Sequence, residues 1–176
     1  SHVFSFIPFL VYYAVNNKFL IISVFVLAGI VHLIRWVLWK PWQSIKAPIL
    51  FILPLSYMWT FIGFFLLSIA SVYDHLFSLA LHSINIGLIG SIIIAMVSRV
   101  SLGHTGRLIK ASKLMITSYI LIQLTAVFRV ILGHASSINY LDSVKISGVL
   151  WTAAFLLLFI SLIPILTQPR VDGRIG

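Results

Sequence analysis

Three observations predict that this chain folds as an all-α, polytopic bundle of transmembrane helices. Hydrophobic residues make up 61% of the 176-residue sequence and charged residues only 9%, which is too little polar surface for a water-soluble globule. Five apolar stretches are long enough to cross a bilayer, and basic residues concentrate in alternate loops. The sequence has no cysteine, which excludes disulfides, thiolate metal sites and cysteine nucleophiles.

The first apolar stretch, residues 3–15, is too short for a full span. No basic region precedes it, so it does not match a signal peptide. We interpret it as the end of a truncated first helix. The chain is then expected to be the C-terminal part of a longer membrane protein, and the remaining N-terminal helices would pack beside it.

Five full spans follow, and residues 1–176 are treated as a single transmembrane domain. Each span has about 20 residues, which at a rise of about 1.5 Å per residue covers a hydrocarbon core of about 30 Å. The predicted positions are 19–39, 47–70, 75–98, 113–132 and 146–166, with a motif loop at 99–112 between the third and the fourth.

Loop charge predicts how these spans are oriented in the bilayer. Lysine and arginine cluster after the first, third and fifth spans, whereas the intervening loops are poorer in cations. By the positive-inside rule, these three spans run from outside to inside, and the motif loop and the C-terminus are cytoplasmic. The same rule accounts for the net charge of +9 without a nucleic-acid partner. Trp36, Trp39 and Trp42 beside these cations are typical of an interfacial aromatic belt.

The third span has two features besides its apolar length. Small residues recur every four positions, which predicts a face along which another helix packs closely. These residues are Ser83, Gly87, Ser91 and Ala95. His82 lies inside the apolar segment, and ionisable residues at membrane depth are functional candidates. It is interpreted either as a ligand or proton relay, or as a histidine bonded to a neighbouring backbone carbonyl.

Arg129 follows a long apolar run near the outer edge of the fourth span. An arginine at this position is a candidate clamp for a carboxylate, such as a haem propionate. The alternative is that its side chain simply extends to water. The terminal histidines His75 and His134 are assigned that role in preference to lining an outer site together with His82. His32 is interpreted as an interfacial anchor near Arg35.

The segment after the third span combines arginine, histidine and glycine. Arg99 and Arg107 flank two glycines, and His104 lies between the glycines. Here cations and backbone N–H groups would meet an anion, and the imidazole would titrate or bind a metal. The alternative is a tight turn in which glycines supply positive φ and arginines meet phospholipid. On one straight helix His82 and His104 would lie about 33 Å apart, so they are assigned to different sites.

Residues 82–90 (HSINIGLIG) and 96–107 (MVSRVSLGHTGR) resemble the signature of the NnrS family of bacterial membrane proteins. Further similar residues are Arg35-Trp36, Arg129-Val130, 147–151 and 164–174. The resemblance implies the C-terminal half of an inner-membrane protein linked to denitrification and to the nitric oxide response, with haem and copper as cofactors. Family members often have a histidine in the second span, where this chain reads Leu53-Pro54-Leu-Ser-Tyr57. One expected metal ligand is therefore absent.

Two functional hypotheses follow. By the resemblance, this is a bilayer-embedded protein of the nitric oxide and nitrosative stress response that binds haem and copper and meets nitric oxide or iron-nitrosyl species. Its candidate cofactor-binding residues are His82, Arg99, His104, Arg107 and Arg129, with His82 and His104 as candidate metal ligands. The alternative is a transporter or channel-like protein without redox chemistry, in which His82, Gln123 and Arg129 line a solute path. No catalytic residue is assigned, because the three aspartates all lie in loops.

Overall fold

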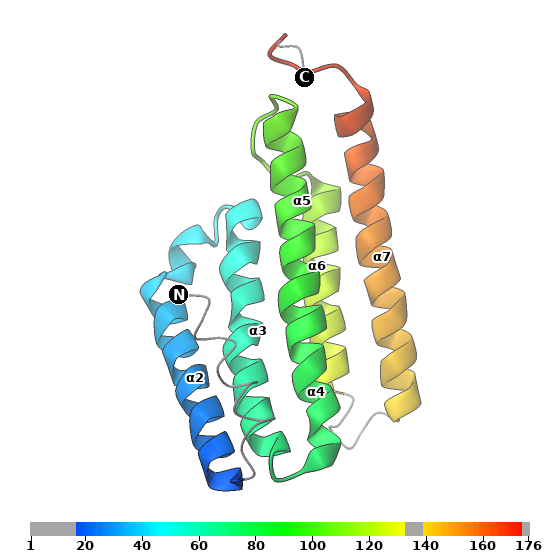
Figure 1. Cartoon of the computed structure of the whole chain (residues 1–176). Helices are drawn as coiled ribbons and strands as arrows, with labels where there is room; N and C mark the ends of the chain where they lie inside the picture. The colour runs from blue at the N-terminus through cyan, green and yellow to red at the C-terminus, as the bar shows by residue number, and fades with distance from the viewer. Residues whose placement is uncertain (1–16, 133–138, 174–176) are drawn as a thin grey trace.

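The computed structural model describes residues 17–132 and 139–173 and confirms the all-α fold. Across these ranges every regular element is a helix, and five helical runs are long and apolar enough to cross a membrane. The runs lie side by side in one bundle, with α2 and α7 on its two flanks (Figure 1). The opening stretch 3–15 and His134 lie outside the described residues.

Each run corresponds to one predicted span. The first is α2, Lys18–Leu38, and the second is α3, Pro48–Ala70, with a short 3₁₀ helix between them at Pro41–Ser44. The third consists of a 3₁₀ turn at Asp74–Leu76, α4 at Phe77–His82, a π-helical segment at Ser83–Gly90 and α5 at Ser91–His104. The fourth is α6, Lys113–Val127, continued by a π-helical segment at Phe128–Leu132, and the fifth is α7, Tyr140–Thr167.

Two helix boundaries differ from those predicted. The third run continues to His104, so residues 99–104, expected to begin the motif loop, are helical. The fifth run begins at Tyr140 instead of 146, after Asn139, whose side chain accepts a hydrogen bond from the Leu141 N–H. Both differences have the same cause. An apolar stretch marks the part of a helix inside the hydrocarbon, whereas capping residues determine where the helix ends.

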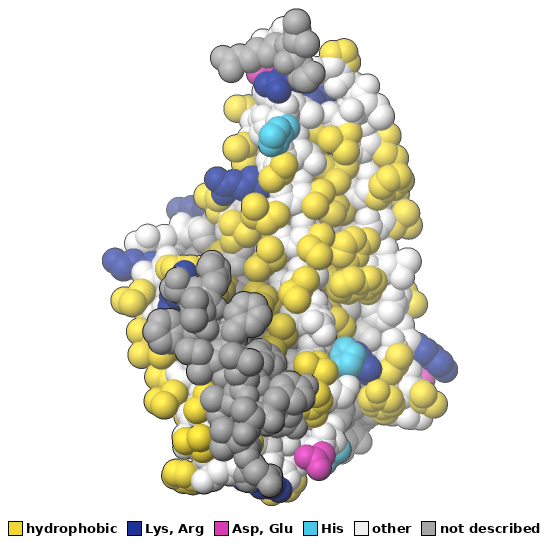
Figure 2. Space-filling model, in the orientation of Figure 1, with side chains coloured by type: hydrophobic (Ala, Val, Ile, Leu, Met, Phe, Trp, Pro, Cys, Tyr) yellow, Lys and Arg dark blue, Asp and Glu magenta, His cyan; other side chains and the backbone are white. Residues whose placement is uncertain are grey.

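Basic residues gather at one end of the bundle, which we call the basic end. There α2 ends, α3 begins and α5 ends (Figure 1), and dark-blue Lys and Arg side chains are visible over these elements in Figure 2. The described basic residues at this end are Arg35, Lys40, Lys46, Arg99, Arg107, Lys110, Lys113 and Arg170. At the far end the described charged residues are two aspartates and three cations, namely Asp74, Asp142, Lys18, Arg129 and Lys145. The described part of the bundle therefore has a strongly asymmetric charge.

Trp59 is central to the packing between the second, third and fourth runs. Its side chain is 1% exposed and lies against Gly87, where an added Cβ would overlap the indole ring. Trp59 Nε1 donates to Gln123 Oε1 at 2.8 Å, and Gln123 Nε2 donates to Ser91 Oγ at 2.8 Å. Ser83 Oγ donates to the Trp59 carbonyl at 3.0 Å. Because hydrocarbon offers no water to these groups, the bonds fix the helices relative to one another.

The predicted face of small residues in the third run is confirmed. Its members, Ser83, Gly87, Ser91 and Ala95, are all buried. One apolar cluster joins α3, α5, α6 and α7, and another joins α2, α3 and α4. The third run therefore lies at the centre of the bundle and contacts both groups of helices.

We predict that Gly87→Ala lowers stability by about 1–3 kcal/mol, the usual cost of overpacking a tight interior. The measurement is the thermal unfolding midpoint in detergent. Gly103→Ala is the matched control, because Gly103 lies in the same run with no atom within 4 Å of an added Cβ and alanine favours the helix. An unchanged midpoint for Gly87→Ala would contradict the close approach of Trp59.

Candidate functional site

His82 and Arg129 line the same groove, near the far end of the bundle from the basic residues. The groove has a volume of about 260 Å³, and we call it the His82–Arg129 groove. Its walls come from the third, fourth and fifth runs and consist of His82, Ile86, Thr125, Arg129, Val144, Ser147, Gly148 and Trp151. Of the five candidate residues chosen from the sequence, these two are the ones that the structure brings together.

Both residues lie at π-helical segments. His82 immediately precedes the segment Ser83–Gly90, and Arg129 is the second residue of the segment Phe128–Leu132. A π-helix is rare and occurs frequently at functional sites. At Gly90 an added Cβ would lie 2.7 Å from the ring of Trp151, which lines the groove. The two irregular segments therefore shape the walls of one site.

The imidazole of His82 is held in one tautomer. Its Nδ1 is hydrogen-bonded to the backbone carbonyl of Ser78, one turn earlier in α4. A carbonyl can only accept, so in the neutral imidazole Nδ1 carries the proton and Nε2 keeps its lone pair. Metal-ligating histidines have this arrangement, in which the second ring nitrogen donates to a carbonyl or carboxylate. In the sequence analysis, a ligand role for His82 was set against a bond to a backbone carbonyl. The structure contains the carbonyl bond, and that bond is compatible with a ligand role.

Arg129 is fixed against the start of α7. Its Nη2 donates to the Tyr140 hydroxyl at 3.2 Å, and its guanidinium carbon lies 5.2 Å from the centre of the Tyr140 ring. Ser143 Oγ donates to the Phe128 carbonyl at 2.7 Å, which ties the second π-helical segment to the same helix. A guanidinium has five N–H donors, so the bond to Tyr140 leaves donors that can bind an anion in the groove.

The groove offers a metal ion a single imidazole. Within residues 17–132 and 139–173, no three His, Cys, Asp or Glu side chains lie close enough together to hold a metal. His82 can therefore ligate a metal that is also held by another group, such as a macrocycle. The described residues do not form a metal site built from protein side chains alone.

His32 is buried, which corrects its interpretation as an interfacial anchor. The side chain is 8% exposed, its Nδ1 lies 2.5 Å from the Tyr57 hydroxyl, and its ring stacks on Phe64 with 5.2 Å between centroids. Both partners belong to α3, so no local sequence pattern around His32 contains them. His75 is exposed near Tyr73, as expected for a terminal histidine.

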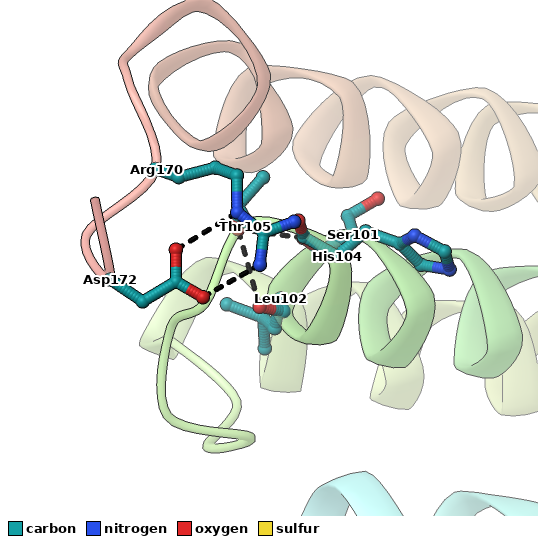
Figure 3. A network of polar contacts seen from close by, with 6 residues as sticks. All are labelled: Ser101, Leu102, His104, Thr105, Arg170 and Asp172. Atoms are coloured by element: carbon teal, nitrogen blue, oxygen red, sulfur yellow. Dashed lines mark hydrogen bonds and ion pairs between the residues drawn. The ribbon is translucent and has the colours of Figure 1, made fainter. Parts of the chain in front are cut away.

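The glycine–histidine motif ends α5 and holds the segment that follows α7 (Figure 3). Arg170 Nη1 donates to the His104 carbonyl at 2.7 Å, while its Nε and Nη2 donate to the Asp172 carboxylate at 2.9 and 2.6 Å. The hydrogen bond to Asp172 raises the pKa of Arg170 above its ordinary value. The Val171 N–H donates to the Thr105 carbonyl at 3.3 Å. We call these contacts the C-terminal latch.

The turn of the motif requires glycine at position 106. Gly106 has a φ of +69°, its N–H donates to the Gly103 carbonyl, and the Arg107 N–H donates to the Leu102 carbonyl. These bonds form a Schellman cap at the end of the helix. The Arg107 side chain then reaches α7, where its Nη1 donates to the Ile165 carbonyl at 3.1 Å. The geometry therefore matches the tight-turn interpretation of this segment.

Arg99 and His104 lie apart from the His82–Arg129 groove. The His104 side chain is exposed and ends the helical run, 22 residues after His82. Arg99 is partly buried on α5 and makes no hydrogen bond or ion pair with the described residues. Together with Arg107, these candidates belong to the basic end.

The groove residues supplied by α7 were missed by the sequence analysis. Val144, Ser147 and Gly148 line the groove, and Tyr140 holds Arg129 from the same helix. Because the fifth span was predicted to begin at 146, Tyr140 and Val144 were placed outside any helix. The family-like stretch 147–151 was the signal that pointed to this part of the chain.

The fold and the groove define a polytopic helical membrane protein with a histidine and an arginine in one groove between three helical runs. The family model described as NnrS protein matches residues 2–170, nearly the whole chain. The chain therefore belongs to the NnrS family, which confirms the resemblance of residues 82–90 and 96–107. No curated protein and no solved structure matches it.

We predict that Gly106→Ala opens the C-terminal latch. Alanine in the left-handed region is strained by about 1–2 kcal/mol, and its Cβ would lie 2.7 Å from Asp172 Cγ. The expected result is faster hydrogen exchange at the Val171 N–H. Gly173→Ala is the control, because Gly173 has the same φ of +69° with nothing near its added Cβ. Equal acceleration in both variants would show that contact with Asp172 is not the cause.

Proposed function

We propose that this protein of the NnrS family serves the bacterial response to nitric oxide and nitrosative stress, including that of denitrifying cells, through a haem bound in the His82–Arg129 groove. One observation carries the proposal: an imidazole whose Nε2 keeps its lone pair and a partly engaged guanidinium line the same intramembrane groove. An imidazole and a cation are the groups that haem iron and haem propionates require.

The groove residues divide between the two parts of such a ligand. His82 Nε2 would bind the iron, with the Ser78 carbonyl keeping the ring oriented. Arg129 would bind a propionate, and Trp151 would contact the apolar macrocycle. The groove volume of about 260 Å³ is below the range of about 300–1,000 Å³ typical of small-molecule sites. The described residues would therefore hold one edge of the haem.

A haem iron in this groove would supply a coordination position for nitric oxide. The chain's own part is to orient the iron ligand through Ser78, to neutralise carboxylate charge through Arg129, and to surround the site with apolar side chains. Nitric oxide is small and uncharged, so it can approach through the apolar bundle or the lipid without a polar channel.

Copper fits the described residues less well. Copper sites combine several imidazole or sulfur ligands, and among the described residues the groove contributes one imidazole, that of His82. His104, the second candidate ligand, lies at the other end of the same helical run. No copper site is therefore derived from this groove.

The charge asymmetry supports an orientation in the bacterial inner membrane. We infer that the basic end faces the cytoplasm, because lysine and arginine concentrate in cytoplasmic loops. The C-terminal latch and the C-terminus then lie on the cytoplasmic side, whereas the His82–Arg129 groove lies toward the outer side.

A transporter or channel without redox chemistry remains the second candidate function, and one observation weighs against it. Its path requires His82, Gln123 and Arg129 to line one cavity. Both ends of the Gln123 amide are instead bonded to Trp59 and Ser91, and Gln123 is not among the residues that line the groove. The geometry favours a local ligand site over a continuous path.

We predict that the intact protein purified in detergent shows a haem absorption band that shifts or disappears in His82→Ala, because the iron loses its axial ligand. Optical absorption and metal analysis of the same samples are the measurements. His104→Ala is the matched control, because His104 is an exposed histidine on the same run and should leave the band unchanged. Wild-type protein without haem would overturn the proposal, and solute flux into liposomes that His82→Ala abolishes would favour the transporter.

We also predict that Arg129→Gln weakens haem retention roughly tenfold, the loss expected for one hydrogen bond to a charged group. The position of the absorption band should stay the same, because Arg129 is not the iron ligand. Haem loss to an acceptor protein measures retention. Lys145→Gln is the control, since Lys145 is an exposed cation at the same end whose nitrogen lies 3.9 Å from Asp142. Equal retention in the two variants would refute the propionate role.

A further inference from the structure

A second groove lies at the basic end, and it shares no residue with the His82–Arg129 groove. Its volume is about 410 Å³, and we call it the basic-end groove. It is lined mainly by apolar side chains from α3, from α5 and from the residue that caps α2, namely Trp39, Leu50, Leu53, Pro54, Tyr57 and Ile92, together with Ser44. Trp39 is 48% exposed and Leu50 40% exposed. The groove therefore opens to the surface of the bundle, where lipid lies.

Arg35 places a positive charge at the edge of this groove. Its guanidinium carbon lies 5.3 Å from the centre of the Trp39 ring and 5.8 Å from the centre of the Tyr57 ring. Both aromatic residues line the groove. Arg35 is also hydrogen-bonded to Tyr57. These contacts fix the guanidinium beside the groove, and its five N–H donors allow more than one partner at a time.

Arg99 supplies a second cation on the α5 side. It follows Ile92 by seven residues, so the two share a face of α5 and Arg99 lies about 10 Å nearer the basic end. Arg99 makes no hydrogen bond or ion pair with the described residues. A partly buried arginine without a protein partner among these residues points to a ligand that the structure does not contain.

The surroundings of the groove contain little negative charge. Lys40 and Lys46 are exposed on either side of the 3₁₀ helix Pro41–Ser44. Two of the three acidic residues in the sequence lie at the far end of the bundle, and the third, Asp172, is paired with Arg170. The cations beside the groove are therefore complementary to an anion from outside the described chain.

We propose that the basic-end groove binds one anionic phospholipid of the bilayer, with an acyl chain in the groove and the phosphate held by Arg99, while Arg35 adds positive charge at the groove edge. Guanidinium groups bind phosphate through paired N–H donors. Trp39 lies where an indole meets the headgroup region, and Lys40 and Lys46 add to the attraction for an anionic headgroup. This site is independent of haem and gives Arg99 a role that the His82–Arg129 groove does not provide.

The test measures lipid retained by the intact purified protein in detergent, using native mass spectrometry. Phosphatidylglycerol and phosphatidylcholine with identical chains are added separately. We expect roughly tenfold tighter retention of phosphatidylglycerol, the effect of one to two favourable charge contacts at a membrane surface, and a higher unfolding temperature with that lipid only. Equal retention of the two lipids would overturn the proposal. So would displacement of phosphatidylglycerol by an equal concentration of glycerol phosphate, which has the headgroup chemistry without the chains.

Variants distinguish the headgroup contact from the groove. Arg99→Gln should weaken phosphatidylglycerol retention roughly fivefold and leave phosphatidylcholine unchanged. Lys18→Gln, an exposed cation at the far end, should change neither. Leu53→Trp should fill the groove and reduce retention of both lipids. If that variant does not fold, the comparison of Arg99→Gln with Lys18→Gln decides the question, and equal phosphatidylglycerol retention in these two would overturn the proposal.

Discussion

The contact between Trp59 and Gly87 is the interaction on which the rest of the bundle depends. The indole occupies the space that any side chain at position 87 would fill, so α3 and the third run approach closely. At that separation Ser83 Oγ reaches the Trp59 carbonyl, and the Trp59 indole N–H reaches Gln123 on α6. Inside a bilayer those polar groups have no water as a substitute partner. One aromatic–glycine contact thus sets the positions of three helices.

The His82–Arg129 groove exists because two of these helices depart from α-helical geometry beside one another. A π-helical segment shifts the backbone hydrogen bonds by one residue, and in lipid the resulting irregularity is tolerated where neighbouring protein supplies partners. The Ser143 hydroxyl bonded to the Phe128 carbonyl is one such partner, and the Trp151 ring packed at Gly90 covers the other segment. The irregular backbone and the ionisable side chains therefore occur together, and both depend on α7.

Much of the fold followed from the sequence because apolar length alone identifies a membrane span. His82 and Arg129 were identifiable for a similar reason, since ionisable residues at the edge or interior of such stretches are rare. The π-helical segments were not predicted, because an apolar pattern does not determine whether each backbone N–H donates to the carbonyl four or five residues earlier. The pairing of His32 with Tyr57 and of His104 with Arg170 was also missed. In each pair the partner lies far away in the sequence, Tyr57 on α3 and Arg170 after α7, beyond the range of any local periodicity.

The segment Ser83–Gly90 also determines the rotation of everything that follows it in the third run. An α-helix turns by about 100° per residue, so converting one π turn to an α turn would twist the far end of α5 by about that angle relative to His82. The latch resists such a twist, because Arg107 and Arg170 fasten the end of α5 to α7 and to the chain after it. A change in winding at the groove would therefore have to break or shift the hydrogen bonds that hold the end of α5.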